Sequence, residues 1–530
     1  MIETGGFTLK RNLILGGLLA MSLVGMTALA GCSSSSDSSV DSGKAAEAPK
    51  AGGTLTIARK ADANNLDPQF ITNIPSANYI FGKVYEGLIK TDKNMDYKPA
   101  LAAEWKLVDD LTWEFKLRKG VTFHDGTPFT AEAVKKTMER ALDPKVNSPR
   151  ASNFSMVKEV KAVDDYTVQF ILKYPYAPLL SILASNEGSI LSPKAIAEQA
   201  DKLSKNPIGT GPFKFQSWTP GQEMILLKND SYWGDVPKVD KVVYKVVPED
   251  TTRVAMVESG EVQISDQLPV TELNRVQNSS SMTLARAEGL GVEYIGFNVK
   301  KKPFDDVRVR QAFAYAIEKE SIIKGVYNGV GSRATSALSP KMIGFNPNLH
   351  DYDYNVNKAK ELLAEAGFPN GFKTSIVTDD RKERINLAEV IQSQLKGIGI
   401  DLEIKVMEYG AYLDITGKGE HNMFIGGWGN ATGDADYNQY NVFHSSSHGS
   451  KGNLAFYTNP EVDKLIEEGR REKDVEKRKA IYAKAQEIEM KDSPLIPIRT
   501  IDHVAATSKS VKGFSLNPVG YLMLNDVTVK

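Results

Sequence analysis

The sequence predicts an α/β protein, because strand-like and helix-like patterns alternate along the chain. Apolar and polar residues alternate with a period of two, as in half-buried strands, in three short runs: 54–58, 112–117 and 167–172. In the second half, a helical pattern over 383–396 stops near Gly397 and Gly399, and a strand pattern follows at once from 400 to 406. A helix that leads so soon into a strand is typical of a βαβ unit.

Three further segments repeat apolar residues with the period of a helix that buries one face: 130–142, 309–317 and 357–366. Thr130 is the expected N-cap of the first helix, and Asp305 or Asp306 is the expected N-cap of the second. Gly367 follows the third segment and is expected to end it, because glycine adopts the left-handed conformation without a side-chain penalty.

The start of the chain has the order of a secretory signal peptide. Two basic residues precede an apolar run over 13–29, and small residues follow it. The run closes in Leu29-Ala30-Gly31-Cys32, which resembles the bacterial lipobox, where a peptidase cuts before the cysteine and the cysteine then carries lipid. We expect residues 1–31 to be removed and Cys32 to anchor the chain. An uncleaved membrane anchor is the alternative, and either arrangement leaves most of the chain outside the cytoplasm.

Cys32 is the only cysteine, so an intramolecular disulfide is excluded. Residues 32–50 are rich in serine and almost free of large apolar side chains, which predicts a flexible tether. No later segment reaches the roughly 18 consecutive apolar residues that a membrane span requires. We therefore expect two or more acyl chains on Cys32 to provide the attachment to the membrane.

Length and charge limit the classes of function. Removal of 31 residues from 530 leaves 499, which is too long for one hydrophobic core and predicts two or three domains. The formal net charge is −1, and it becomes −2 when Lys10, Arg11 and Glu3 are lost. A chain so near neutrality has no general attraction for nucleic acid, and we expect no such partner.

The motifs of common enzymes and metal sites do not occur in the sequence. Only His444 and His448 are close among six histidines, and they lack the glutamate of a metalloprotease motif. The acidic run 434–438 resembles the start of a calcium loop, but the glycine and the final acid of that loop are missing. No phosphate-binding glycine loop and no Gly-x-Ser-x-Gly elbow is present. We expect no catalytic residue, cofactor or metal; a secreted, membrane-tethered hydrolase with carboxylates far apart in sequence is the alternative.

The run 424–437 is suited to close contact with a ligand. Its glycines allow the backbone to approach a ligand, and Trp428 offers a rigid apolar surface. Asp434 and Asp436 offer negative charge for an ammonium group. The alternative is a surface loop with a buried tryptophan and ordinary turn residues.

Five stretches of the mature chain decide between these readings: PALAAEW at 99–105, LTWEFKLRKGVTFHDGTPFTAEAV at 111–134, GTGPF at 209–213, NDSYW at 229–233 and PFDDVRVRQAF at 303–313. Together they resemble the family 5 bacterial extracellular solute-binding proteins. That group includes oligopeptide-, dipeptide-, glutathione- and nickel-binding receptors.

The resemblance implies a two-lobed, periplasmic-binding-protein-like α/β fold (type II, cluster C) whose first lobe carries an extra subdomain. By that pattern lobe I is built from three segments: 51–92, 205–293 and 497–530. The extra subdomain takes 93–204, and lobe II takes 294–496. The lobes are expected to close over a ligand about a hinge.

The resemblance also implies where the ligand lies. In peptide-binding members the ligand backbone pairs like an added strand with both lobes. The matching positions are Thr72, Asn73 and Ile74 in lobe I, and Gly427, Trp428, Gly429 and Asn430 in lobe II. Ala431 stands where peptide receptors commonly place an aspartate for the ligand's α-ammonium, so Asp434 or Asp436 is the expected substitute. Arg381 and Arg384 are the candidates for a ligand carboxylate, with Arg333 as a third.

These inferences predict the lipid-anchored substrate-binding protein of an ABC importer. It would be a monomer at the outer face of the cell membrane, or on the periplasmic side where there are two membranes, and it would deliver peptides or peptide-like solutes to permease subunits. A nickel or metal-chelate receptor of the same family is an alternative. A receptor for peptide signals uses the same binding physics and is not distinguished by the sequence.

Overall fold

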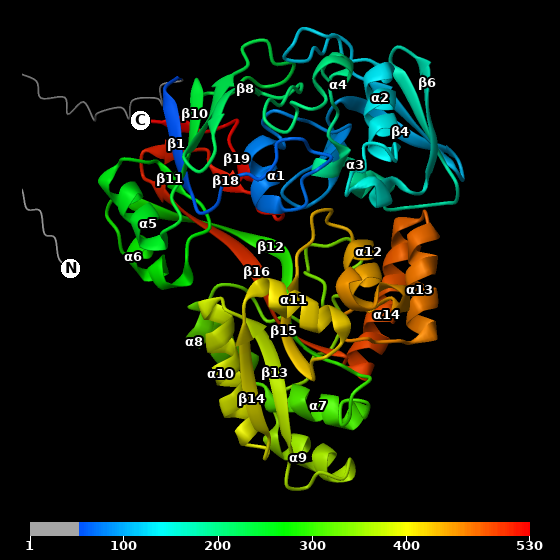
Figure 1. Cartoon of the computed structure of the whole chain (residues 1–530), viewed down its shortest axis with the longest axis vertical. Helices are drawn as coiled ribbons and strands as arrows, with labels where there is room; N and C mark the ends of the chain where they lie inside the picture. Colours follow the sequence, from blue (N-terminus) through cyan, green and yellow to red (C-terminus); the bar gives the residue numbers. More distant parts are fainter. Residues whose placement is uncertain (1–51) are drawn as a thin grey trace, which may run out of the picture. The chain divides into compact units, whose positions relative to one another are not determined.

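The computed structural model describes residues 52–530 and confirms the α/β class (Figure 1). The predicted signal peptide, the lipid attachment at Cys32 and the tether over 32–50 lie outside the described residues. Among residues 52–530, no helix is both long enough and apolar enough to cross a bilayer.

One ten-stranded sheet runs through both lobes in the order β14-β13-β15-β12-β16-β11-β1-β10-β9-β8. Lobe I contributes β1 (Thr54–Arg59), β8 (Phe213–Thr219), β9 (Glu223–Lys228), β10 (Lys241–Val246) and β11 (Ile264–Ser265). Lobe II contributes β13 (Lys373–Asp379), β14 (Asp401–Met407) and β15 (Met423–Trp428). The long strands β12 (Met282–Phe297) and β16 (Leu495–Ser508) lie between the two sets and run side by side from one lobe to the other (Figure 1).

Lobe II contains the predicted βαβ unit. β13 and β14 pair in parallel, from Lys373 opposite Asp401 to Asp379 opposite Met407, and α10 (Lys382–Lys396) connects them. Leu387, Ile391 and Leu395 of α10 are buried in the core of this lobe. The sheet in lobe II therefore forms as the sequence pattern predicts.

The other predicted helices are also present. α7 (Val307–Ala316) begins after Asp306, whose side chain accepts a hydrogen bond from the backbone N–H of Arg308. α9 (Val356–Glu365) ends before Gly367, which has a φ of +91°. Thr130 stands at the N-cap of α2 (Ala131–Leu142), but its side chain makes no capping hydrogen bond, so the expected capping contact is absent although the boundary is correct.

The extra subdomain has its own sheet and core. β4 (Ala102–Asp109), β5 (Thr112–Leu117), β7 (Thr167–Leu172) and β6 (Val157–Asp164) form an antiparallel sheet in the order β4-β5-β7-β6. Phe115 and Phe170 from neighbouring strands are fully buried, with ring centroids 5.5 Å apart. α2 packs on this sheet, and Figure 1 shows α1 (Ile74–Ile80) and α4 (Pro193–Gln199) between the subdomain and strands β8 and β10 of lobe I.

Shorter elements complete the two lobes. In lobe I and its subdomain they are β2 (Ile89–Thr91), β3 (Tyr97–Pro99), α1 (Ile74–Ile80), α3 (Leu179–Leu183), α4 (Pro193–Gln199), α5 (Asp250–Ser259) and α6 (Leu273–Gln277). In lobe II they are α8 (Lys319–Tyr327), α11 (Tyr409–Lys418), α12 (Ala435–Asn438), α13 (Pro460–Arg471) and α14 (Val475–Asp492). The C-terminal segment adds β17 (Val511–Lys512), β18 (Ser515–Leu516), β19 (Leu522–Met523) and β20 (Thr528–Val529).

The ladder between β12 and β16 is interrupted where the chain passes between the lobes. Ala287 pairs with His503 and Gly291 pairs with Ile501, so β12 advances four residues while β16 advances two. The extra residues bond elsewhere: the Leu290 N–H donates to the Pro518 carbonyl, and the Ser339 hydroxyl donates to the Gly289 carbonyl. A second register shift follows between Glu293 and Tyr294. Interruptions of this kind weaken a ladder locally, which fits a hinge.

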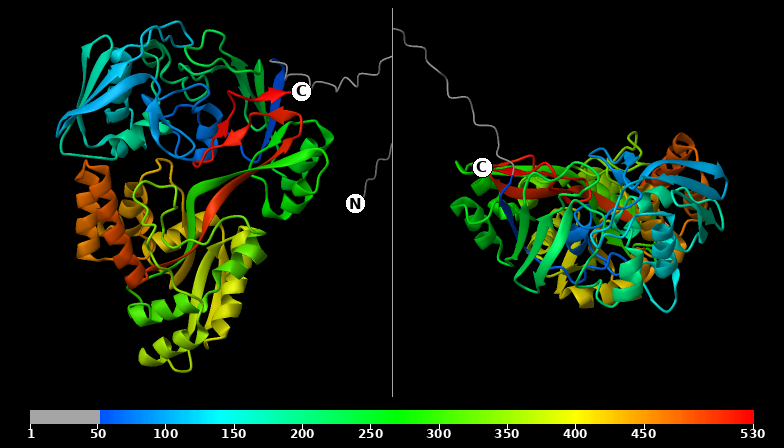
Figure 2. Two further views of the ribbon diagram at one scale, coloured as in Figure 1. Left: turned by 180° about the vertical axis from the view of Figure 1, so that it is seen from behind. Right: turned by 90° about the horizontal axis from the view of Figure 1, so that it is seen from above.

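Away from these register shifts, α13 of lobe II lies against the extra subdomain (Figures 1 and 2). The backbone N–H of Ala177 donates to the Arg470 carbonyl over 2.8 Å, and Lys473 forms an ion pair with Asp110. The two lobes are thus in contact at both ends of their interface.

The close approach at Gly289 gives a testable expectation. A Cβ atom there would lie 1.9 Å from the carbonyl oxygen of Ile501, whereas at Gly291 it would meet only the Ile501 side chain, at 3.2 Å. Gly289→Ala should lower the free energy of unfolding by about 1–3 kcal/mol, as overpacking does, with Gly291→Ala as the milder control. Urea unfolding measures both, and equal effects of the two substitutions would contradict the expected backbone clash.

Candidate functional site

A cavity of about 300 Å³ lies where segments of both lobes and the extra subdomain meet. We call it the first cavity. Thr72, Asn73 and Ile74 line it from lobe I, and Gly429 and Ala431 line it from lobe II. Positions that are more than 350 residues apart in the chain are therefore neighbours, as expected of a site that both lobes enclose.

The lobe I wall is an extended segment with unused backbone donors. Asn73 is the N-cap of α1, with φ −136° and ψ 148°, and its side chain accepts a hydrogen bond from the Ser76 N–H over 2.8 Å. Among the hydrogen bonds of residues 52–530, none comes from the backbone N–H of Thr72 or Asn73. This wall therefore offers extended backbone and free donors to the cavity.

The lobe II wall has the same property. β15 ends at Trp428, and in the next three residues, 429–431, no backbone N–H donates to another group of the described chain. No hydrogen bond from the described residues reaches their carbonyl oxygens either. Two walls with unpaired backbone groups thus face one cavity.

The side chain of Asn430 holds the loop that follows β15, which we call the 429–438 loop. Its Oδ1 accepts from the backbone N–H groups of Thr432 and Gly433 over 2.8 and 2.7 Å. Its Nδ2 donates to Asn438 Oδ1 over 2.9 Å. Asn430 is 2% exposed and does not line the cavity, so its side chain shapes the loop while its neighbours present backbone.

Trp428 and Gly427 belong to the strand and not to a surface loop. Gly427 pairs with Glu293 of β12, and Trp428 packs against Tyr437 with ring centroids 6.1 Å apart. The indole Nε1 of Trp428 is buried without a hydrogen-bond partner in the described part of the chain. Neither residue lines the first cavity, although Tyr437 does.

Two charged side chains of the extra subdomain line the cavity, and sequence reasoning missed both. Arg150 and Glu187 form an ion pair over 3.1 Å, and Glu187 is only 6% exposed. Arg150 Nε also donates to the Ile71 carbonyl over 2.8 Å, which ties the pair to the lobe I wall. The two residues are separated by a strand pair and belong to no motif, so no sequence signal connected them. Tyr521, from the C-terminal segment, was missed for the same reason.

Asp434 and Asp436 do not line the first cavity, because helices of lobe II bind them. Asp434 is 1% exposed and accepts two hydrogen bonds from Arg478 of α14, over 2.5 and 2.6 Å. Asp436 pairs with Arg470 of α13 over 3.0 Å and accepts from Tyr482 over 3.2 Å. Burial raises the pKa of Asp436 above its ordinary value. A ligand ammonium would have to displace an arginine to reach either carboxylate.

Arg381 and Arg384 lie together at the carboxyl end of β13, outside the first cavity. Arg381 makes two hydrogen bonds to Asp379, over 2.8 and 2.7 Å, and its side chain is 57% exposed. Arg384 is buried and donates to Asp379 and to the Ile425 carbonyl. Arg333 is bound elsewhere, by Asp351 and Glu320.

The two histidines close in sequence also have local partners. His444 Nδ1 lies 2.8 Å from the Ser446 hydroxyl, and His448 Nε2 lies 2.8 Å from the Tyr457 carbonyl. Within residues 52–530, no three side chains of histidine, cysteine, aspartate or glutamate are grouped so as to hold a metal ion.

The Asp434–Arg478 pair yields a second expectation. Asp434→Asn leaves the buried Arg478 cation without its partner and should lower the free energy of unfolding by about 3–5 kcal/mol. Glu468→Gln is the control, because its partner Lys464 is 74% exposed and surface pairs contribute little. Urea unfolding without added ligand measures both. Unchanged stability of the Asp434 variant would contradict its assignment to the scaffold.

Comparisons with known proteins agree with this geometry. Residues 96–450 match the model of the bacterial extracellular solute-binding proteins, family 5 Middle. The glutathione-binding protein GsiB of Escherichia coli (strain K12) is 31% identical over 473 residues, which cover 88% of this chain and 92% of that protein.

Solved structures also align over most of this chain. The ABC transporter-associated periplasmic binding protein DppA from Helicobacter pylori, in complex with the peptide STSA, has a TM-score of 0.76 at 34% identity and covers 90% of this chain and 99% of its own. HbpA2 from Haemophilus parasuis has a TM-score of 0.82 at 29% identity. The alignment covers 90% of this chain and 100% of the HbpA2 chain. The two-lobed architecture, the match over most of the chain and these relatives agree, and the chain belongs to family 5 of the bacterial extracellular solute-binding proteins.

Proposed function

We propose that this protein is the lipid-anchored substrate-binding component of an ABC importer and that the first cavity captures peptides or peptide-like solutes. The observation that carries the peptide part is the pair of cavity walls with free backbone groups, at 72–73 and 429–431. An extended peptide presents alternating N–H and C=O groups, which match such walls in the manner of an added strand. DppA of Helicobacter pylori, whose structure contains a peptide, is similar over nearly its whole length.

Binding by backbone explains how one site could accept many peptides. Main-chain groups supply affinity that does not depend on side-chain identity, while the cavity walls restrict size. Tyr437 and Tyr521 give part of the lining an apolar, aromatic character, which suits varied side chains. Peptides, glutathione and related solutes share the amide backbone that such a site recognises.

Charge in the cavity suits a ligand with two charged ends. Glu187 is the carboxylate on the wall, and we assign to it the ammonium contact that was expected of Asp434 or Asp436. Arg150 is the cation beside it and suits a ligand carboxylate, with the exposed Arg381 as a further candidate. A ligand that separates the Arg150–Glu187 pair can replace both lost contacts, because its ammonium can bind Glu187 and its carboxylate can bind Arg150.

Capture follows from closure of the lobes. A ligand that contacts both walls binds more tightly to the closed state, so it shifts the balance between open and closed forms toward the closed form. The interrupted ladder near Gly289 is where we expect the bending. The closed face would then be presented to the permease subunits.

Arg150 is the residue on which to test the binding assignment. Arg150→Gln should weaken binding of di- to pentapeptides or glutathione by about ten-fold or more, because a charge-assisted hydrogen bond is lost. Lys145→Gln, an exposed lysine of the same connection, should bind as the unmodified protein does. Isothermal titration measures both, with nickel–histidine mixtures as a further arm.

The outcomes separate the alternatives. No heat with any peptide or with glutathione would overturn the proposed ligand class, and heat with nickel–histidine alone would favour a metal-chelate receptor. Peptides that are recovered as cleavage products by mass spectrometry would instead indicate the hydrolase.

The lipid anchor is tested separately. Cys32→Ser should abolish incorporation of labelled fatty acid and release the protein from the membrane fraction, whereas Ser33→Ala should change neither. Retention of the label by the Cys32 variant would contradict attachment at that residue.

A further inference from the structure

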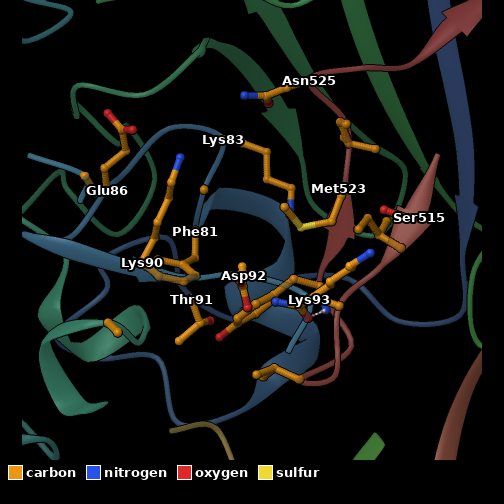
Figure 3. A pocket seen from close by; sticks show the side chains of 18 of the residues that line it. Phe81, Lys83, Glu86, Lys90, Thr91, Asp92, Lys93, Ser515, Met523 and Asn525 are labelled. Carbon is orange, nitrogen blue, oxygen red and sulfur yellow. Dashed lines mark hydrogen bonds between the residues drawn. The ribbon is translucent and has the colours of Figure 1, made fainter. Parts of the chain in front are cut away.

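A second cavity, of about 400 Å³, adjoins the first, and Figure 3 shows side chains that line it. Its walls come from residues 81–95 of lobe I, from the C-terminal segment 513–526, and from Ala431 and Thr432 of lobe II. It shares Ala431 and Tyr521 with the first cavity. A ligand group that passes these two residues would enter the second cavity from the first.

Lys83 is the unusual residue in this lining. It is 2% exposed, and its ammonium donates one hydrogen bond, to Asn78 Oδ1 over 3.1 Å. No carboxylate within residues 52–530 lies within 4.0 Å of its Nζ atom. Lys319 is the other lysine buried in the described chain, and it has the partner that Lys83 lacks: Asp351, at 2.6 Å.

The groups around Lys83 do not replace a carboxylate. An ammonium group carries three donors, whereas Asn78 offers one neutral oxygen that also accepts from the Leu522 N–H. The ring of Tyr521 lies 5.7 Å from Nζ, and the positive charge of Arg59 opposes that of Lys83. Burial and this repulsion lower the pKa of Lys83 well below its ordinary value. A buried cation without a counter-charge is costly unless something pairs with it.

None of the four acids that line the same cavity forms an ion pair with Lys83, although one of them, the exposed Asp235, has no ion-pair partner among the described residues. Glu86 accepts hydrogen bonds from Thr210, Tyr232 and Trp233, and Figure 3 shows it pointing away from Lys83. At the rim, Asp92 pairs with Lys98 and Asp526 pairs with Lys238. The lining therefore has a buried lysine amine that no carboxylate of the described residues pairs with.

We propose that the second cavity is a carboxylate subsite in which Lys83 binds the anion. The rest of the lining fits a short apolar arm behind the acid, because Phe81, Met95 and Leu522 form part of the wall. Exposed Lys90 and Lys93 at the same cavity favour the approach of an anion. The carboxylate is either an acidic arm of the solute in the first cavity, which rests on the proposed function, or a separate small carboxylic acid.

The first arm of the test does not depend on peptides. Protein labelled with ¹³C at the lysine Cε positions is titrated with pH in the presence and absence of sodium acetate or butyrate, and Lys83→Met assigns the Lys83 signal. A bound carboxylate stabilises the ammonium form, so the Lys83 titration should move to higher pH while the signal of Lys319 stays unchanged.

The second arm identifies the source of the carboxylate. Tripeptides that carry glutamate or glutamine at each position in turn are compared by isothermal titration. If the acid belongs to the main solute, one glutamate peptide should bind roughly ten-fold more tightly than its glutamine twin, and Lys83→Met should remove that difference without weakening the glutamine peptide. Lys145→Met, at an exposed lysine outside both cavities, is the control and should keep the preference.

The two arms together distinguish the source of the carboxylate, the subsite itself and the proposed function. A Lys83 response to acetate or butyrate without any glutamate preference supports the subsite for a separate acid. A Lys83 response combined with no binding of any peptide supports the subsite but overturns the proposed function. No Lys83 response to acids, together with a glutamate preference that is absent or persists in Lys83→Met, overturns the subsite.

Discussion

The antiparallel ladder of β12 and β16 is the contact on which the two-lobed arrangement depends. Both strands cross from one lobe to the other, so each lobe's part of the sheet grows from an end of the same pair. Hydrogen bonds keep the two ends in register, and the two register shifts, after Ala287 and after Glu293, are where we propose that the pair bends. A uniform ladder would join the lobes rigidly, whereas two flexible linkers would let them drift apart. A bulged pair permits rotation about a defined axis while it preserves alignment of the facing walls.

Alignment matters because the walls present backbone and not a fixed set of side chains. The walls are the extended residues 72–73 and the glycine-containing start of the 429–438 loop. A ligand that pairs with both walls must present N–H and C=O groups with the spacing of an extended backbone. Such recognition depends on the distance between the walls to within a hydrogen-bond length. If the proposed function holds, scaffold contacts such as those of Asn430 with Thr432 and Gly433 affect binding even though they touch no solute.

Local patterns predicted the fold well, whereas the chemistry of the site depended on contacts that sequence does not reveal. The β13–α10–β14 unit and the ends of α7 and α9 followed from periodicity and end signals, because nearby residues determine them. The places of Thr72, Asn73 and Gly429 around one cavity agree with the resemblance, but their role toward a ligand stays a prediction. Arg150 and Glu187 were missed because two elements far apart in the chain bring them together. Asp434 and Asp436 have the composition of ligand contacts, yet only tertiary packing shows that α13 and α14 already hold them.

Those two buried carboxylates couple the loop to the rest of the molecule. Asp436 is held by Arg470, whose own carbonyl accepts the Ala177 N–H of the extra subdomain, and Tyr176 lies 3.4 Å from the same aspartate. Arg470 therefore takes part both in holding the 429–438 loop, through Asp436, and in the contact with the extra subdomain, through Ala177. Residues 429–431, by contrast, make no hydrogen bonds through their backbone to the described chain. The buried carboxylates fasten the loop to α13 and α14 and, through Arg470, to the extra subdomain, so a substitution at Asp436 would disturb the loop and the contact between the lobes together.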